Sequence, residues 1–452
     1  MKPAIRIPAP TVLLIALVAF VTAMDNTIVV AAAPTIGRDL GLSVTVLQWL
    51  SIAYLLPYAG LLLLAGTLVD RFGERRTLLT GLAAFAVFAV LAGVAGTAGL
   101  LIAARVGQGC GAALIVPATM SLVRTRLPQS ARATGAAVWT AALAAALALG
   151  PWLGGVLAEY ASWRWIFAAA LPFVLPAMLL APEDDDPGGA VRVRPAPAVV
   201  VTSGLVLVVG AVVLRGVPGT GAAPLLAGGA GVAVLWWFVR LERRATAPLV
   251  PRPLVADRPF LLINVVASLW GVGIGGVVFF TPLRYQDGLG LSPQAAALPL
   301  VLVAVALIVT APFVPRALRR MGPQWTIAGG LVLVAAGLCW LAVVDHLPGL
   351  GSRLGGLLVI GLGSACTTPL TALALDRADA AMAGAASGVL TASRELAGAF
   401  GVALFGLTLS VAGYRAGLLA AAVLQLAAAG LTFFALRSRS PTAAPVPPFV
   451  HH

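Results

Sequence analysis

The strongest constraint on this chain is a succession of apolar segments, each about as long as a helix that crosses a lipid bilayer. Such a helix needs roughly 20 apolar residues. The 452-residue sequence is 60% hydrophobic and only 10% charged, whereas soluble proteins carry about 25% charged residues. The sequence therefore predicts an all-α polytopic membrane protein.

Fourteen segments meet the length criterion, and we expect each to form a transmembrane helix. The short pair 198–214 and 222–239 separates two sets of six and is flanked by charged, proline-containing stretches typical of linkers. The segments are approximately 11–33, 44–68, 78–97, 99–122, 133–158, 164–181, 198–214, 222–239, 260–281, 292–314, 324–343, 354–375, 383–410 and 414–436. The predicted organisation is an N-terminal six-helix bundle (1–181), a linker with two extra helices (182–259), a C-terminal six-helix bundle (260–436) and a cytoplasmic tail (437–452).

The basic residues between these segments predict the orientation of the chain. If the N-terminus is cytoplasmic, 21 of the 29 basic residues fall in inside loops and six fall in outside loops. This asymmetry follows the positive-inside rule and places both termini in the cytoplasm, in the cell (inner or cytoplasmic) membrane. The net charge of +13 therefore reflects the orientation of the chain in the membrane, and we expect no nucleic-acid partner.

The cysteine and histidine content gives no support to an enzyme or a metal protein. The three cysteines form no Cys-x-x-Cys pair, and two of the three histidines are the last two residues. No histidine is available at membrane depth for a nucleophile–base pair or a metal site. We expect neither a metal nor a cofactor, and no enzymatic activity.

Four charged residues lie inside predicted helices: Asp25, Arg105, Arg394 and Glu395. Asp25 lies eight residues before the outer end of its segment, about 12 Å deep at 1.5 Å per residue. Arg105 has a similar depth, so the two can form an ion pair. Glu395 lies near the midplane, and its neighbour Arg394 points about 100° away along the helix surface, so the two cannot simply neutralise each other.

Acids at membrane depth usually mark ion pathways. Burial favours the protonated form of a carboxyl group and a nearby cation favours the charged form. An acid whose surroundings alternate between wet and dry can therefore take up a proton on one side of the membrane and release it on the other. The alternative is a permanent salt bridge that only fixes helix packing.

The loop "GTLVDRFGERR" (66–76) is the most specific string in the chain. We expect Gly66 to let the helix end pack closely and Gly73 to permit a sharp turn. Asp70, Arg71 and Arg75 then make a charged latch on the cytoplasmic side. The alternative is an ordinary basic inside loop.

The segment "LGPWLGGVLAEY" (149–160) concentrates glycine in one helix. Gly150 and Gly154 are four residues apart and form a flat stripe where a second helix can approach, and Pro151 adds a bend. Gly155 belongs to the same cluster. The alternative is generic helix packing.

These motifs resemble the major facilitator superfamily, specifically its fourteen-helix drug:proton antiporters. The loop 66–76 is similar to the signature loop after helix 2, with Glu74 where a base is usual. "RVGQGCGAA" (105–113) resembles the helix 4 motif, and "GPWLGG" (150–155) the antiporter motif of helix 5. "MDNTIVVAAAP" (24–34) resembles the helix 1 motif, while "SRELAGAFGVA" (393–403) is a looser match, with Glu395 where relatives often have Gln.

The resemblance implies two six-helix bundles around a cavity that opens alternately to each side, usually in a monomer. It implies proton-coupled efflux of a small amphipathic organic compound such as a drug, antibiotic or toxic metabolite, with protons as the coupling ion. The residues expected to couple protons are Asp25, Glu395, Arg105 and Arg394, and those expected to bind substrate are Asp25, Gln108 and Glu395. An importer or uniporter on the same fold is the main alternative; a membrane-embedded enzyme or a sensor is a weaker one.

Overall fold

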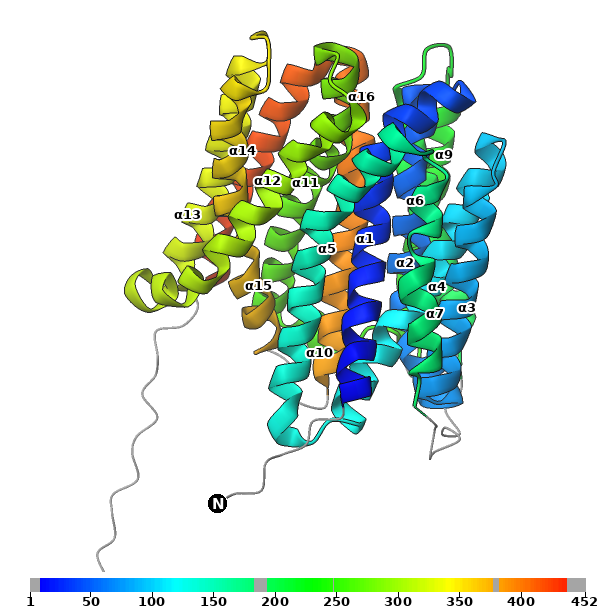
Figure 1. Ribbon diagram of the computed structural model, residues 1–452. Helices are drawn as coiled ribbons and strands as arrows, with labels where there is room; N and C mark the ends of the chain where they lie inside the picture. The colour runs from blue at the N-terminus through cyan, green and yellow to red at the C-terminus, as the bar shows by residue number, and fades with distance from the viewer. Residues whose placement is uncertain (1–8, 183–192, 247, 377–381, 437–452) are drawn as a thin grey trace, which may run out of the picture.

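The computed structural model describes residues 9–182, 193–246, 248–376 and 382–436, and every regular element within them is a helix (Figure 1). The two shortest, η1 (Gln129–Ala131) and η2 (Ala311–Phe313), are single 3₁₀ turns. The α-helices are α1 (Ala9–Leu40), α2 (Val44–Phe72), α3 (Glu74–Gly93), α4 (Ala98–Thr125), α5 (Arg132–Tyr160), α6 (Trp165–Ala168), α7 (Leu171–Leu179), α8 (Pro195–Arg215), α9 (Ala223–Arg244), α10 (Arg252–Ala256), α11 (Arg258–Leu289), α12 (Pro293–Thr310), α13 (Val314–Val344), α14 (Gly351–Ser364), α15 (Thr367–Leu375) and α16 (Ala383–Leu436).

Eleven helical stretches of the described residues are long and apolar enough to cross a membrane. Two of them contain a glycine with a non-helical, positive φ: Gly322 (φ 78°) in the stretch 293–344 and Gly413 (φ 85°) in the stretch 384–434. Because only glycine adopts this conformation readily, the chain turns there and each stretch contains two helices. The segment expected at 164–181 forms the short helices α6 and α7, so a total of fourteen spans stays a prediction.

Side-chain caps explain where several helices begin. Ser43 accepts a hydrogen bond from the backbone N–H of Val46 (3.4 Å) at the start of α2, and Thr97 does the same for Leu100 (3.3 Å) at the start of α4. Such caps satisfy N–H groups that have no partner within the helix.

The helices pack as two groups, and α1 and α5 lie on the side of the first group that faces the second (Figure 1). In the first group α1 packs along α5, and α4 packs against α2 and α3; in the second, α11 packs along α16 and α13 along α14. The groups meet where α2 contacts α16 and where α5 contacts α12. The extra helices α8 and α9 pack on each other, and α8 also contacts α2.

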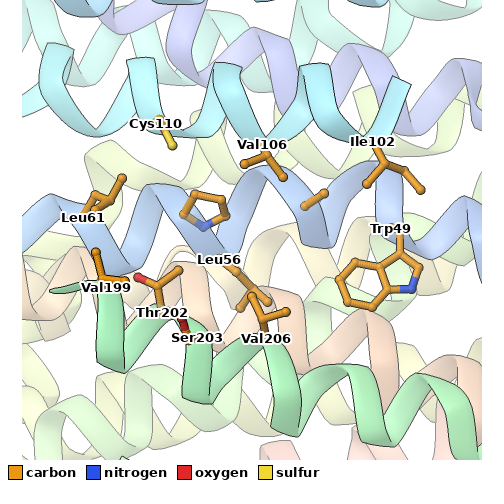
Figure 2. A pocket seen from close by; sticks show the side chains of 12 residues that line it. Trp49, Leu56, Leu61, Ile102, Val106, Cys110, Val199, Thr202, Ser203 and Val206 are labelled. Atoms are coloured by element: carbon orange, nitrogen blue, oxygen red, sulfur yellow. The ribbon is translucent and has the colours of Figure 1, made fainter. Parts of the chain in front are cut away.

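A narrow apolar crevice of about 300 Å³ remains between α8 and the core helices α2 and α4 (Figure 2). Trp49 and Leu56 of α2, Val106 of α4 and Val206 of α8 form much of its wall. Thr202 of α8 also lines this crevice and lies close to α2, because Gly60 of α2 has no side chain and leaves room for it. The inserted pair is therefore attached through α8 to both bundles, at α2 and at α16.

Candidate functional site

Asp25 lies near the middle of α1, where it is almost completely buried (1% exposed). It follows the first residue of α1 by 16 positions and precedes the last by 15, which places it about 23 Å from the helix end. The expected end of this segment at residue 33 is therefore wrong, because α1 continues to Leu40; the depth of Asp25 in the membrane stays a prediction. A charged group at this depth needs partners from other helices.

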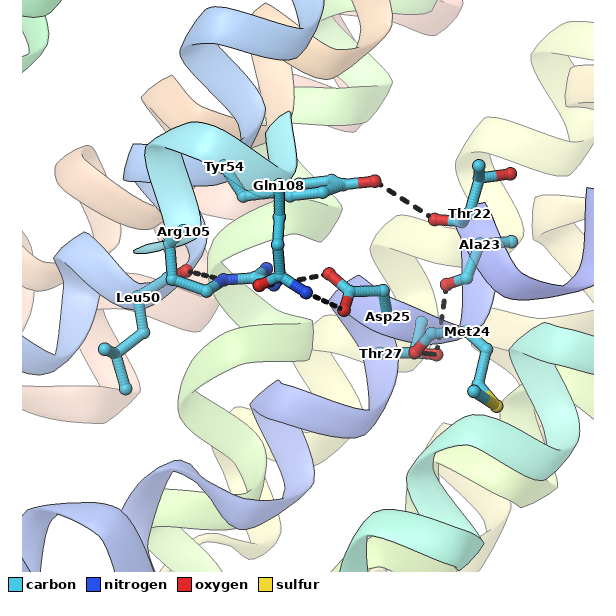
Figure 3. Close-up of polar contacts among 9 residues, drawn as sticks. All are labelled: Thr22, Ala23, Met24, Asp25, Thr27, Leu50, Tyr54, Arg105 and Gln108. Atoms are coloured by element: carbon cyan, nitrogen blue, oxygen red, sulfur yellow. Dashed lines mark hydrogen bonds and ion pairs between the residues drawn. The ribbon is translucent and has the colours of Figure 1, made fainter. Parts of the chain in front are cut away.

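Two side chains of α4 supply those partners (Figure 3). The Arg105 guanidinium forms an ion pair with Asp25 Oδ2, and Gln108 Nε2 donates to Asp25 Oδ1 at 2.9 Å. Arg105 Nη1 also donates to Gln108 Oε1 at 3.0 Å. Arg105 and Gln108 are three residues apart and therefore share one face of α4. The structure thus brings together Asp25, Arg105 and Gln108 in one closed network, which includes the ion pair that the sequence allowed for the first two.

Arg105 is also held by α2, which the sequence did not indicate. Its Nε donates to the carbonyl oxygen of Leu50 at 2.8 Å, and its guanidinium carbon lies 4.5 Å from the centroid of the Tyr54 ring. Tyr54 in turn donates from its hydroxyl to the carbonyl oxygen of Thr22 in α1 at 3.2 Å. This close approach is possible because Gly109 of α4 lies against the backbone of Tyr54. One buried arginine therefore ties together α1, α2 and α4.

Glu395 and Arg394 of α16 do not join this network. Glu395 is half-buried and Arg394 is exposed. Within the described part of the chain, neither side chain makes an ion pair or a hydrogen bond. The expectation that adjacent residues cannot simply neutralise each other is consistent with this arrangement. This part of α16 packs on α2, where Gly398 lies against Leu55, and the charges of both Glu395 and Arg394 lie within electrostatic range of the Tyr58 hydroxyl.

The loop between α2 and α3 turns at Gly73, which has a φ of 87° as the sharp turn requires. Asp70 and Arg71 are exposed at the end of α2, and Arg75 is half-buried in the first turn of α3. The expectation for Gly66 is wrong: a Cβ there would have no atom within 4 Å. Gly66 instead lines a cavity between α2, α4 and α16.

Glu74, which replaces a basic residue in the resembled loop, binds α4. It accepts hydrogen bonds from Ser121 Oγ (2.6 Å) and from Thr125 Oγ1 (2.9 Å to Oε2). Because Glu74 lies in the first turn of α3, its negative charge also interacts favourably with the positive end of the helix dipole. The acid therefore fastens the loop end of α3 to the last turns of α4.

We expect Glu74→Ala to lower the free energy of unfolding by about 1–2 kcal/mol, because two hydroxyls lose a charged acceptor at a partly exposed site. The melting temperature of the purified protein in detergent, followed by tryptophan fluorescence, measures this. Arg76→Ala, which removes an exposed charge from the same turn, is the control and should shift the melting temperature little. Equal shifts for both variants would contradict the proposed role of the hydroxyl contacts.

The glycine cluster of α5 faces two helices. A Cβ on Gly150 or Gly154 would collide with α1: with Thr27 in the first case and with the Ile28 carbonyl oxygen in the second. A Cβ on Gly155 would lie 2.8 Å from Gln294 Cα of α12. The predicted stripe is therefore present, but α5 is wedged between the helix that carries Asp25 and a helix of the second bundle.

Polar contacts join the two bundles at the face where α1 ends. Arg38 of α1 donates to Gln286 Oε1 (2.8 Å) and Asp287 Oδ1 (3.5 Å) of α11. Glu159 of α5 accepts from the backbone N–H of Gln294 in α12 at 3.0 Å. The sequence gives no signal for these contacts, because they join segments that lie far apart in the chain. They hold the bundles together at this face.

Comparison with known proteins agrees with this architecture. Residues 15–402 match the profile described as the Major Facilitator Superfamily. The chain is 34% identical to the cephamycin export protein CmcT of Amycolatopsis lactamdurans, covering 88% of this chain and 84% of that one. It is 32% identical to the multidrug efflux pump LfrA of Mycolicibacterium smegmatis, covering 89% and 80%.

Solved structures support the fold. The crystal structure of the POT family transporter PepTSo superimposes with a TM-score of 0.70 at 14% identity, covering 95% of this chain and 98% of that one. The D-xylose–proton symporter gives 0.65 at 17% identity, covering 94% and 97%. The match over most of the sequence, together with the two-bundle fold, shows that the chain is a membrane transporter of the Major Facilitator Superfamily.

Proposed function

We propose that this transporter exports a small amphipathic organic compound, such as a drug, antibiotic or toxic metabolite, in exchange for protons. Export is supported by the relatives, which are named as antibiotic export proteins and multidrug efflux pumps. Proton coupling is supported by one observation: a fully buried carboxyl group, Asp25, at the centre of a spanning helix. Membrane-embedded acids of this kind usually lie on ion pathways.

In this proposal the proton changes the contact between α1 and α4. Ionised Asp25 holds Arg105 and Gln108; protonated Asp25 loses the charge that attracts Arg105. Arg105 keeps its bond to Leu50 and its contact with Tyr54, so it stays with α2 and α4 while its ion pair with α1 is lost. Because α5 packs closely against both α1 and α12, a movement of α1 is transmitted through α5 to the second bundle.

The driving force is sufficient for concentrative export. A charge moved across the membrane gains about 2.3 kcal/mol per 100 mV, and each 1.4 kcal/mol corresponds to a tenfold concentration ratio. One proton per cycle can therefore sustain a substantial gradient of an uncharged compound. Glu395 and Arg394 stay candidates for a second proton step.

We also propose the finer topology: fourteen spans, both termini in the cytoplasm, and a monomer in the cytoplasmic membrane. The charge asymmetry of the loops supports this orientation. The face where α1 begins is then cytoplasmic, and the contacts of Arg38 and Glu159 lie on the outer side. Labelling of single cysteines introduced at residues 38 and 71 with a membrane-impermeant reagent tests it: in intact cells residue 38 should react and residue 71 should not.

Asp25→Asn should abolish export driven by a pH gradient in proteoliposomes, because an amide cannot carry the proton. Asp39→Asn is the matched control on the same helix: Asp39 is exposed and, among the described residues, bonds only to Trp163 and Arg164 near the helix end. Two measurements test this. The first is uptake of a fluorescent drug with and without an imposed pH gradient, and the second is proton movement reported by an internal pH dye. Export by Asp25→Asn at the parental rate, with proton movement intact, would refute the proposal.

A further inference from the structure

The part of α13 before its break carries a basic cluster, formed by Arg316, Arg319 and Arg320, whose side chains are all exposed. The chain leaves α12 through η2, continues as a short helix to Met321 and changes direction at Gly322 (φ 78°). Figure 1 shows this part of the chain projecting sideways from the base of the second group of helices, on the face where α1 begins. In a membrane transporter the cluster therefore lies at the edge of the protein, next to lipid.

The corresponding turn of the first bundle has the same backbone conformation but a different balance of charges. Gly73, which precedes α3, has φ 87° and ψ 160°, and Gly322 has φ 78° and ψ 168°. Residues 70–76 combine three arginines with two acids, and one of these acids, Glu74, binds hydroxyls of α4. Residues 316–322 contain three arginines and no acid. The second turn therefore has a net positive charge that no acid of its own balances.

Other parts of the described chain do not neutralise this cluster either. Within the ranges that the structure describes, Arg319 and Arg320 form no ion pair or hydrogen bond, and Arg316 bonds only to a backbone carbonyl oxygen of its own turn, at 3.4 Å. The sequence holds no acid from residue 288 to residue 344. Asp376 ends α15, which contacts α13, but it pairs with none of the three arginines. The cluster is thus free to bind an anion from outside the chain.

Large apolar side chains lie beside the arginines and are also exposed. Phe313 is 59% exposed, Met321 54% and Trp325 63%. The Arg316 guanidinium carbon lies 5.8 Å from the centroid of the Phe313 ring, and the Trp325 ring packs edge-on against Phe433 of α16 at 5.0 Å. Aromatic residues next to arginines are typical of the boundary between lipid headgroups and acyl chains. The combination fits a lipid better than a soluble anion.

We propose that the turn formed by residues 313–325 binds the headgroup of an anionic phospholipid such as phosphatidylglycerol. The guanidinium groups of Arg316, Arg319 and Arg320 contact the phosphate, for which arginine has a matching fork of N–H donors. The exposed rings of Phe313 and Trp325 lie against the upper part of the acyl chains. The inference goes beyond the proposed function and rests on it only for the leaflet, since the proposed topology places this face at the cytoplasmic surface, where anionic lipids attract basic segments.

Lipid binding to the purified full-length protein in detergent tests the site without transport. Native mass spectrometry, in titrations with dioleoylphosphatidylglycerol and separately with dioleoylphosphatidylcholine, gives the affinity for each lipid. We expect the parent to prefer phosphatidylglycerol. One arginine near an anionic surface contributes about fivefold in affinity, so Arg319→Gln/Arg320→Gln should bind phosphatidylglycerol roughly 25-fold more weakly. Arg319→Lys/Arg320→Lys keeps the charge and should retain most of the affinity.

Trp325 reports where the lipid lies. Phosphatidylglycerol brominated on its acyl chains near the glycerol quenches the fluorescence of tryptophans that it contacts. Because the chain has 10 tryptophans, the quenching that is lost in Trp325→Phe is the part that arises at this turn. We expect Trp325→Phe to be quenched less than the parent, and Arg319→Gln/Arg320→Gln to lose the same part of the quenching.

The matched control removes two arginines from the opposite face. Arg215 ends α8 and Arg415 follows the break at Gly413; both are exposed, and neither forms an ion pair or hydrogen bond within the described ranges. Arg215→Gln/Arg415→Gln should bind phosphatidylglycerol as the parent does. Glycerol 3-phosphate, which carries the phosphate without acyl chains, should not displace the lipid at equal concentration. Matching melting temperatures establish that the variants are folded.

The inference is overturned if the parent binds both lipids equally, if Arg319→Gln/Arg320→Gln binds phosphatidylglycerol as well as the parent, or if the control variant loses as much affinity. Displacement by glycerol 3-phosphate would mean a site for a soluble anion and would also overturn it. Its failure is distinct from that of the proposed function. A protein without lipid preference that still exports through Asp25 refutes only the lipid site, and selective lipid binding in a protein that moves no protons refutes only the antiport.

Discussion

Arg105→Gln and Asp25→Asn should each lower the free energy of unfolding by about 3–5 kcal/mol, because each leaves a buried charge without its partner. Both side chains are at most 1% exposed, so water cannot replace the lost contact. The double variant should recover much of this loss, since it buries no charge at all. Melting temperatures of the four proteins in detergent form a double-mutant cycle that measures the coupling.

An exposed ion pair that starts from the same helix provides the matched comparison. Arg164 and Asp39 lie 3.0 Å apart, with side chains 40% and 48% exposed, and such pairs contribute about 0–1 kcal/mol. The cycle of Asp39→Asn and Arg164→Gln should therefore show little coupling. Additive losses at Asp25 and Arg105 would mean that the two side chains do not stabilise each other.

The sequence predicted the helical segments well because hydrophobic length is a local property. The break at Gly322, for example, lies directly before Pro323 and the expected segment 324–343. It also allowed an ion pair between Asp25 and Arg105, because the two residues have a similar expected depth. The end of the first helix was less predictable, since α1 extends through Pro34 to Leu40.

Other features depend on contacts between segments far apart in the chain, which one sequence does not reveal. Arg353 is one of the six basic residues that the sequence places in outside loops. In the structure it is 2% exposed in the first turn of α14, where it donates to the Asp345 carbonyl oxygen at 2.9 Å. The register of α16 on α2, in which Gly388 lies against Leu63 and Gly398 against Leu55, likewise follows from nothing local. Gly66 shows the same limit, because the sequence cannot tell a glycine that allows close packing from one that borders a cavity.

Gly154→Ala should destabilise the protein and stop transport, although it adds only one methyl group. The added Cβ would overlap the Ile28 carbonyl oxygen and lie 3.1 Å from the Ala31 Cβ, both in α1. A backbone oxygen cannot rotate away as a side chain can, so α5 must separate from α1. Overpacking of this kind costs about 1–3 kcal/mol, and Gly154→Val should cost more.

Gly430→Ala is the matched control, because no atom lies within 4 Å of a Cβ at that position of α16. Alanine also favours the helix by about 1 kcal/mol relative to glycine, so the control should melt at the parental temperature or above it. Drug transport by Gly154→Ala in proteoliposomes is the second measurement. If α5 relays a movement of α1 to α12, transport should fall further than the loss of folded protein explains. Transport that simply follows the folded fraction would mean that the glycine stripe serves only packing.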